Sequence, residues 1–161
     1  MNGQLIGAIE AELRQIAAAR LRYEKGCSLS TGDLINEALA RIIAQSGLEL
    51  TSRSEALALS SYVMRQVLVD HARKKQAAKR AHQPVTLHSQ IPGSEPVDLL
   101  DLEAQLASLA EIDEDRVRLV EMRFYGGMTL EEIADATGMS LATVKRRWAS
   151  TRAWLQDRLA Q

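Results

Sequence analysis

The sequence contains few residues that would brace a fold covalently or interrupt a helix. Cys27 is the only cysteine among 161 residues, which excludes an intrachain disulfide and fits a reducing compartment. The chain has three prolines, and aromatic residues make up 4% of it. Because proline breaks helices and aromatic residues are enriched in strands, this composition favours a helical protein.

Long apolar runs and metal-ligand patterns are also missing. No stretch is apolar for the length needed to cross a bilayer, and the N-terminal MNGQLIGAIEAEL has neither a basic segment nor a small-residue cleavage site. His71, His82, His88 and the single cysteine do not have the spacing of zinc ligands. The Asp70-His71 pair is similar to a metal-dependent phosphohydrolase dyad, but no second His or Asp cluster accompanies it. We therefore expect a soluble cytoplasmic protein with no membrane contact, metal, cofactor or catalytic residue.

The net charge of −1 hides a segregation of charge along the chain. Residues 62–80 carry six Lys/Arg and one Asp, whereas residues 91–115 carry eight Asp/Glu and no Lys/Arg. Residues 140–158 are basic again, with five Lys/Arg and one Asp. Two basic blocks therefore flank an acidic one, and a polyanion such as DNA remains a plausible partner despite the net charge.

Residues 128–158, MTLEEIADATGMSLATVKRRWASTRAWLQDR, predict two helices joined by a tight turn. Thr129 and Glu132 have the spacing of a capping box, so the first helix should begin at Leu130. Gly138 is placed to end that helix in a left-handed conformation, and Ser140 is placed to cap the next one. The three-to-four-residue turn between them is typical of a helix-turn-helix.

The second of these helices should bury one side and expose a basic one. At about 100° per residue, the expected buried stripe consists of Leu141, Val144, Trp148, Thr151 and Leu155. The opposite face carries Ala142, Arg146, Ala149, Ser150 and Ala153, with Thr143, Lys145 and Arg147 at its flanks. Small residues permit close approach, and basic groups suit phosphates and guanine edges, so the pattern indicates the major groove of DNA. The alternative is a helical hairpin with a solvated basic face.

The remaining pattern predicts an all-α protein of two small helical domains joined by a flexible linker. Residues 1–80 should form the first domain, with helices over residues 4–24, from Ser30 or Thr31 onward, and from about 55 to 80. Residues 81–97 contain all three prolines and no helical period, as expected of a linker. Residues 98–161 should form the second domain, with helices marked by Leu99, Leu102, Leu106 and Leu109 and by residues 115–125, followed by the helix-turn-helix.

The long helix of the first domain ends in a basic cluster, Arg73, Lys74, Lys75, Lys79 and Arg80. Basic residues at a helix C-terminus are favourable for dipole reasons alone. Five in eight positions exceed what capping needs, and this favours a phosphate contact.

With these features in place, nearly the whole chain resembles the extracytoplasmic-function (ECF) group of bacterial sigma factors, in the sigma-70 family. The segment RVRLVEMRFYGGMTLEEIADATGMSLATVKRRWASTRAWL resembles the domain that reads the −35 promoter element. The segment GDLINEALARII resembles the helix that docks on the polymerase clamp coiled coil. The segment YVMRQVLVDHARKKQAAKR resembles the helix that meets the −10 element.

The resemblance implies roles for three groups of residues. Polymerase contacts would be made by Asp33, Asn36, Glu37 and Arg41. Contacts near −10 would be made by Tyr62, Arg73, Lys74, Lys75, Lys79 and Arg80. Contacts at −35 would be made by Thr129, Ser140, Thr143, Lys145, Arg146 and Arg147, with Arg146 the best candidate for a base contact. The two domains would be region 2-like and region 4-like.

The function implied is that of a noncatalytic sigma factor, which binds core RNA polymerase and promoter DNA and directs transcription initiation. An anti-sigma factor is a further partner that the sequence leaves open. The acidic linker would either mimic nucleic acid in a polymerase channel or only keep the chain extended and soluble. One alternative function is a free-standing helix-turn-helix regulator that acts without polymerase. Another is a pure interaction module, because SRSEALALSSY offers only Tyr62 where aromatic residues usually precede the −10 helix.

Overall fold

The part of the chain that the structure describes is almost entirely helical, as the sequence predicts. The computed structural model describes residues 7, 10, 11, 14, 15, 31–44, 52–78, 86–87 and 97–160. Its elements are α2 (Thr31–Ala44), α3 (Arg53–Ala78), β1 (Thr86–Leu87), β2 (Val97–Asp98), α4 (Leu99–Ile112), α5 (Glu114–Val120), the π-helical turn η1 (Glu121–Tyr125), α6 (Leu130–Thr137) and α7 (Leu141–Leu159). Most of the predicted helix over residues 4–24 lies outside the described residues.

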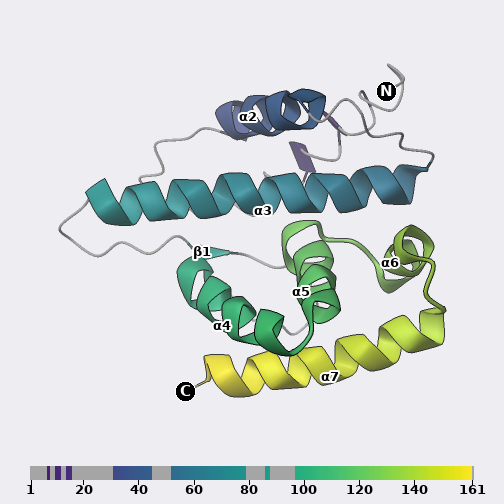
Figure 1. Cartoon of the computed structure of the whole chain (residues 1–161). Helices are drawn as coiled ribbons and strands as arrows, with labels where there is room; N and C mark the ends of the chain where they lie inside the picture. The colour runs from purple at the N-terminus through teal and green to yellow at the C-terminus, as the bar shows by residue number, and fades with distance from the viewer. Residues whose placement is uncertain are drawn as a thin grey trace.

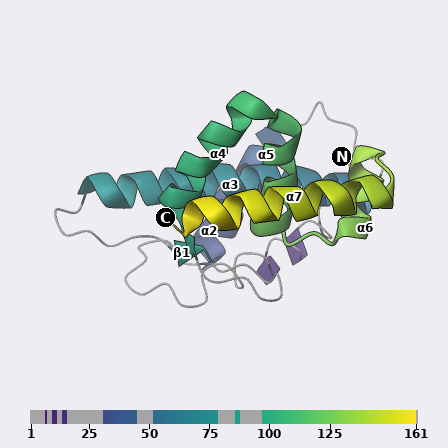
Figure 2. The same ribbon diagram turned by 90° about the horizontal axis from the view of Figure 1, so that it is seen from below.

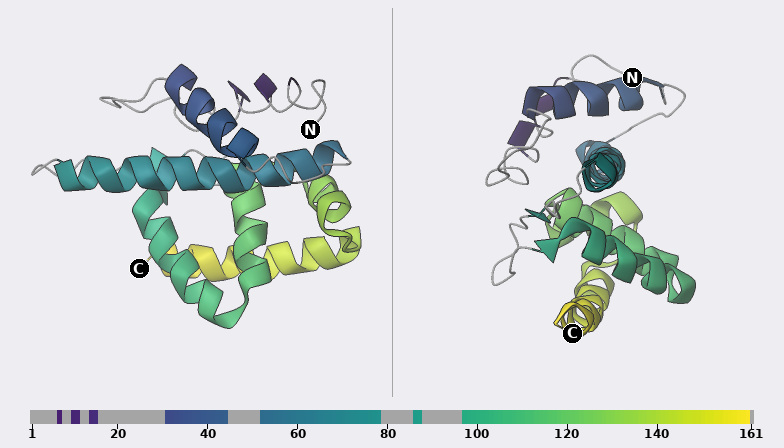
Figure 3. Two further views of the ribbon diagram at one scale, coloured as in Figure 1. Left: turned by 45° about the horizontal axis from the view of Figure 1, so that its top comes forward. Right: turned by 90° about the vertical axis from the view of Figure 1, so that its left-hand side faces the viewer.

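Helix α3 occupies the centre of the molecule (Figure 1). Helix α2 packs on one side of it, and α4, η1 and α6 pack on the other side. Helix α7 lies beyond that second layer and follows the same direction as α3 (Figures 1 and 3). Seen from below, α7 lies along the length of α3 (Figure 2). The chain therefore forms successive layers, with α2 and α7 on opposite outer faces.

The buried side chains of α3 account for its central place. Val63, Met64, Val67, Leu68 and Ala72 are each at most 2% exposed, as predicted. Ser60 and Ser61 are fully buried as well, and their hydroxyls donate to the carbonyls of Ala56 and Leu57 at 2.8 Å. Because these hydroxyls form their hydrogen bonds within α3, other helices can cover α3 on both sides without leaving a buried polar group unpaired.

The helix predicted over residues 115–125 is interrupted. The α-helical part ends at Val120, and the amide of Gly126 then donates to the carbonyl of Glu121 at 3.1 Å. This five-residue spacing makes a π-helical turn, which widens the helix by one residue. Both Phe124 and Tyr125 are buried as a result.

The segment predicted as a linker is tied at two points. Thr86 and Leu87 pair with Asp98 and Val97 as a short antiparallel ladder. Asp98, the first residue of the predicted second domain, caps α4 by accepting from the amides of Leu100 and Asp101, and the acidic residues that follow it lie on α4 and at the start of α5.

The buried residues of α3 and of the C-terminal helices belong to one hydrophobic cluster. The cluster includes Leu68 from α3, Leu102 from α4 and Trp148 from α7. The two predicted domains are thus packed together in this structure, and the division between them stays a prediction.

Local capping fixes the bounds of α6 and α7 as expected. Thr129 and Glu132 form the predicted capping box, with the Glu132 amide donating to Thr129 Oγ1 at 3.1 Å. Gly138 ends α6 with a φ of 76°. Ser140 then caps α7 by accepting from the amide of Thr143 at 3.2 Å. The turn between the helices is therefore set by Gly138, which ends α6 in the left-handed conformation, and by Ser140, which caps α7 in an extended one.

Gly138→Ala should destabilise the folded chain by about 1 kcal/mol, because an L side chain is strained at this positive φ. No atom lies within 4 Å of the added Cβ, so the cost should come from the backbone alone. Urea unfolding followed by circular dichroism measures the difference. Gly138→Asn is the matched control and should cost less, because asparagine tolerates this conformation. Equal midpoints for Gly138→Ala and the wild type would contradict the assignment.

Thr129→Ala should also cost about 1 kcal/mol, because the amide of Glu132 loses its acceptor. Thr129→Ser keeps the hydroxyl and should retain most of the stability. The same unfolding experiment distinguishes the two variants. If serine and alanine are equally destabilising, the side-chain cap is not what holds the start of α6.

Candidate nucleic-acid and polymerase interfaces

Helix α7 presents one apolar and one basic side. Val144, Trp148, Thr151 and Leu155 are buried, and Leu141 is half-buried, which confirms the predicted stripe. The exposed side carries Lys145 and Arg146 together with small residues, Ala142, Ala149, Ser150 and Ala153. A helix backbone flanked by such small residues can lie close to a nucleic acid while the two cations reach its phosphates or bases.

The remaining −35 candidates lie at the entry of this helix. Ser140 is exposed, and its hydroxyl donates to Thr143 Oγ1 at 2.8 Å while it caps α7. Thr143 and Arg147 are half-buried at the flanks of the basic side. Thr129 is exposed at the start of α6. Five of the six candidates are thus gathered on the first two turns of α7 and its cap, and Thr129 stands on the neighbouring helix.

Beneath α7, Trp148 is held by two residues of η1. Its ring centroid lies 6.0 Å from that of Phe124, and the Arg123 guanidinium carbon lies 5.1 Å from the Trp148 centroid. Arg123 also donates to the carbonyl of Met128 at 2.8 Å. Burial, with a contribution from nearby Arg152, lowers the pKa of Arg123. Arg123 was not among the residues predicted from the sequence. A cation between the apolar residues Met122 and Phe124 was nevertheless a sign that it packs on an aromatic ring.

The basic cluster at the end of α3 is divided by the structure. Arg73 and Lys74 are exposed, whereas Lys75 is buried. Lys79 and Arg80 lie outside the described residues. The exposed pair alone therefore presents cations at the described end of α3, and Lys75 faces the interior of the protein.

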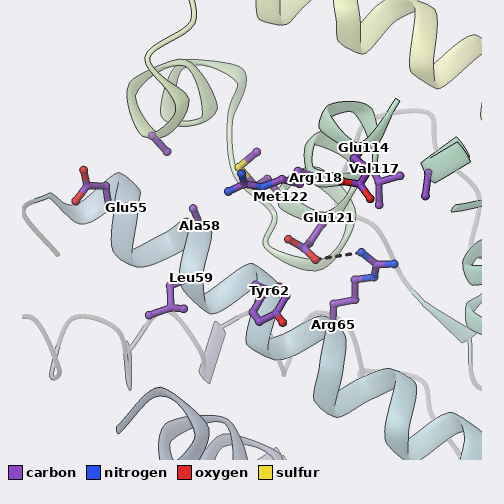
Figure 4. A pocket seen from close by; sticks show the side chains of 12 residues that line it. Glu55, Ala58, Leu59, Tyr62, Arg65, Glu114, Val117, Arg118, Glu121 and Met122 are labelled. Carbon is purple, nitrogen blue, oxygen red and sulfur yellow. Dashed lines mark hydrogen bonds and ion pairs between the residues drawn. The ribbon is translucent and has the colours of Figure 1, made fainter. Parts of the chain in front are cut away.

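Tyr62 and Arg65 lie one turn apart near the middle of α3 and line an open cleft of about 520 Å³ (Figure 4). Tyr62 is 44% exposed. Arg65 was not singled out from the sequence, yet its guanidinium contacts both carboxylate oxygens of Glu103 at 2.8 and 2.9 Å and Glu121 at 3.2 Å. The middle of α3 therefore carries an aromatic ring beside a cation that is already paired.

The ionisation of this group reflects its burial. Burial acts to lower the pKa of Arg65, but its hydrogen bond to Glu103 and the charges of Glu103 and Glu121 together raise it. Burial raises the pKa of Glu121, although the Arg65 charge opposes the shift. Burial likewise raises the pKa of Tyr125, whose hydroxyl lies 3.4 Å from Glu103. Both charges of a buried pair lose hydration, so the contact costs part of what its attraction contributes.

Helix α2 carries the four polymerase candidates. Asp33 and Asn36 are exposed, and Glu37 is half-buried. Arg41 donates to Glu37 at 2.9 Å and to Asp70 of α3 at 2.8 Å. The hydrogen bond to Asp70 is the main reason that the pKa of Arg41 is raised. In this structure Arg41 joins α2 to α3, while Asp33 and Asn36 face outward.

The candidates therefore form separate surfaces on α2, α3 and α7, and α2 and α7 lie on opposite sides of the molecule (Figure 1). Within the described ranges, no group of three His, Cys, Asp or Glu residues could hold a metal ion. None of the helices described there is long and apolar enough to span a membrane.

The family model for ECF sigma factors matches residues 1–161, the whole chain. No curated protein and no solved structure matches it. Because this match spans the whole chain, including the α2 segment and the basic helix α7, it is sufficient to assign the family. The protein therefore belongs to the ECF sigma factors, which bind core RNA polymerase, direct it to promoter DNA and support the initiation of transcription.

Proposed function

We propose that the exposed side of α7 reads the −35 element. The exposure of Arg146 between two small residues, Ala142 and Ala149, is the observation that carries this assignment. The buried stripe beneath it, fixed by Trp148 against Phe124, holds the orientation of the helix. Lys145 and Arg147 flank Arg146 and would contact phosphates, and the start of α6 at Thr129 would add a backbone contact.

The same proposal assigns α3 to the −10 element and α2 to core polymerase. Arg73 and Lys74 are exposed where the phosphate backbone would pass, and Tyr62 has the ring on which an unstacked base could lie. Asp33 and Asn36 face outward on α2, and Asp33 lies in its first turn. A region 2-like unit over residues 1–80 and a region 4-like unit over residues 98–161 would thereby bind DNA weakly, and tethering both on one enzyme would add their affinities.

The chain would have no chemistry of its own in this scheme, because core polymerase supplies the catalytic site. It would act in the cytoplasm, where polymerase and promoter DNA meet. An anti-sigma factor covering the outer face of α2 or the basic side of α7 would block one of the two contacts, and it belongs to the same proposal.

Arg146→Ala should weaken promoter use by about 1–3 kcal/mol in a manner that depends on the −35 sequence, because a bidentate base contact is lost. Promoters are first found by sequencing the transcripts that core polymerase and the chain start on genomic DNA. Run-off transcription from one of them, with single changes in its −35 element, then measures the effect.

Two variants serve as controls for Arg146→Ala. Lys74→Ala should weaken all promoters alike and flatten the salt dependence, because it removes a phosphate contact. Arg158→Ala removes the same charge from the far end of α7, where the guanidinium stacks on Trp154 at 4.4 Å, and should leave the −35 preference unchanged. An unchanged −35 preference and activity in Arg146→Ala would show that another face of α7 meets the DNA.

Asn36→Ala should reduce affinity for core polymerase roughly fivefold, since one lost interfacial hydrogen bond contributes about 1 kcal/mol. Its position on the exposed face of α2 predicts an unchanged melting temperature. Competition for core polymerase against the labelled wild-type chain measures the affinity. Ala44→Ser, an exposed change at the end of the same helix, is the control. Equal competition by Asn36→Ala and the wild type would remove this face of α2 from the proposed interface.

A further inference from the structure

Arg123 of η1 contacts both of the helical segments that carry the proposed −35 surface. Its Nη1 donates to the carbonyl of Met128, just before α6, at 2.8 Å. Its guanidinium carbon lies 5.1 Å from the ring centroid of Trp148, on the buried side of α7. The planar guanidinium is therefore fixed by a hydrogen bond at one edge and by an aromatic ring at its face.

This position is unfavourable for a charge. Arg123 is half-buried, and burial is the main reason that its pKa is lowered. The positive charge of Arg152 on α7 lowers the pKa further, and the exposed Glu131 acts in the opposite direction. Among the residues that the structure describes, no carboxylate forms an ion pair with Arg123, and its Nε is buried without a hydrogen-bond partner. An apolar side chain of similar length would avoid this loss of hydration, so stability alone does not account for an arginine here.

The side of α7 that faces outward depends on how its buried side is held. Arg146 and Trp148 are two positions apart, so their side chains point about 160° apart around the helix. A rotation of α7 that moves Trp148 therefore moves Arg146 as well. A functional side chain keeps its selectivity only within roughly 0.5 Å and 10–20° of its productive geometry, whereas the flexible side chain of Lys145 can follow a phosphate.

We propose that Arg123 is a positioning residue for the −35 element, which holds Trp148 and thereby aligns Arg146 with the edges of the bases. Arg123 does not contact the DNA in this proposal. It lies outside the helix-turn-helix of residues 128–158, on the element that precedes it. The proposal rests on the assignment of α7 to the −35 element and adds a residue that determines how sharply the element is read.

Tryptophan fluorescence tests the contact without DNA. In a Trp154→Phe background the emission comes from Trp148 alone, because the chain has two tryptophans. Arg123→Met retains the length of the side chain but removes the cation, and it should change the intensity and wavelength of the emission. Arg116→Met is the matched control, since Arg116 is a half-buried arginine of α5 that pairs with Asp113 at 3.5 Å. It should leave the emission unchanged. An unchanged emission in Arg123→Met would overturn the proposal.

Run-off transcription with core polymerase tests the effect on reading, well below the melting temperature of each variant. The measured quantity is the discrimination ratio, initiation at the matched −35 element divided by initiation at a single-base variant of it. Arg123→Met should lower this ratio by about fivefold or more, because a misaligned bidentate contact loses its selectivity. Arg123→Lys keeps the charge without the planar group and should lower the ratio too. Arg116→Met should keep the wild-type ratio.

A double-mutant cycle tests whether Arg123 acts through Trp148. In a Trp148→Leu chain, which keeps the buried side of α7 apolar, Arg123→Met should have no further effect on the discrimination ratio. An equal loss of discrimination in both backgrounds would overturn the proposal. If Trp148→Leu does not fold, Arg123→Lys decides alone, and a wild-type discrimination ratio in that variant would overturn the proposal.

The remaining outcomes separate this role from its alternatives. Weakening of all promoters alike with a flatter salt dependence would show that Arg123 contacts a phosphate directly, and this would overturn the positioning role. A wild-type ratio in Arg123→Met together with a lowered ratio in Arg146→Ala would also overturn it, and would leave the assignment of α7 intact. An unchanged ratio in Arg146→Ala would remove that assignment and this proposal with it.

Discussion

Burial of α3 on two opposite sides is the constraint on which the rest of the structure depends. Val63, Met64 and Val67 are almost completely removed from water, and the hydroxyls of Ser60 and Ser61 are satisfied within the helix, so no part of this surface needs solvent. Helix α2 covers one side and the C-terminal helices cover the other. The proposed binding surfaces consist of the side chains that this arrangement leaves exposed.

The contacts around α3 combine apolar burial with a few paired charges, some of them buried and some half-exposed. Arg41 joins α2 to α3 through Asp70, and Arg65 joins α3 to α4 and η1 through Glu103 and Glu121. Such pairs fix the register between helices because a wrong alignment would leave a charge unpaired, while their net contribution to stability is small. The two sets of ion pairs therefore fix how α2, α4 and η1 sit against α3.

Helix α7 serves two purposes with different sides. Trp148 packs on Phe124 and lies beside Arg123, and this fixes the rotation of the helix, whereas Arg146 is left facing outward. A binding surface on a rigid helix loses little conformational entropy when it binds, because only its side chains remain to be ordered. The orientation of the basic side of α7, which is the proposed promoter-reading surface, thus follows from the aromatic contact beneath it.

The sequence by itself determined the helices α2, α3, α4, α6 and α7, the caps at Thr129, Gly138 and Ser140, the buried stripe of α7 and the family, because each depends on neighbours within a few residues or on the order of motifs along the chain. Only the tertiary structure decided that Lys75 is buried, that Arg41 and Arg65 are paired, and that Thr86 and Leu87 of the predicted linker form a strand pair with Val97 and Asp98. The ion pairs depend on partners 29 to 56 positions away, as for Arg41 with Asp70 and Arg65 with Glu121. Helical periodicity tells which side of a helix is buried, but the residue that covers it is chosen by packing in three dimensions.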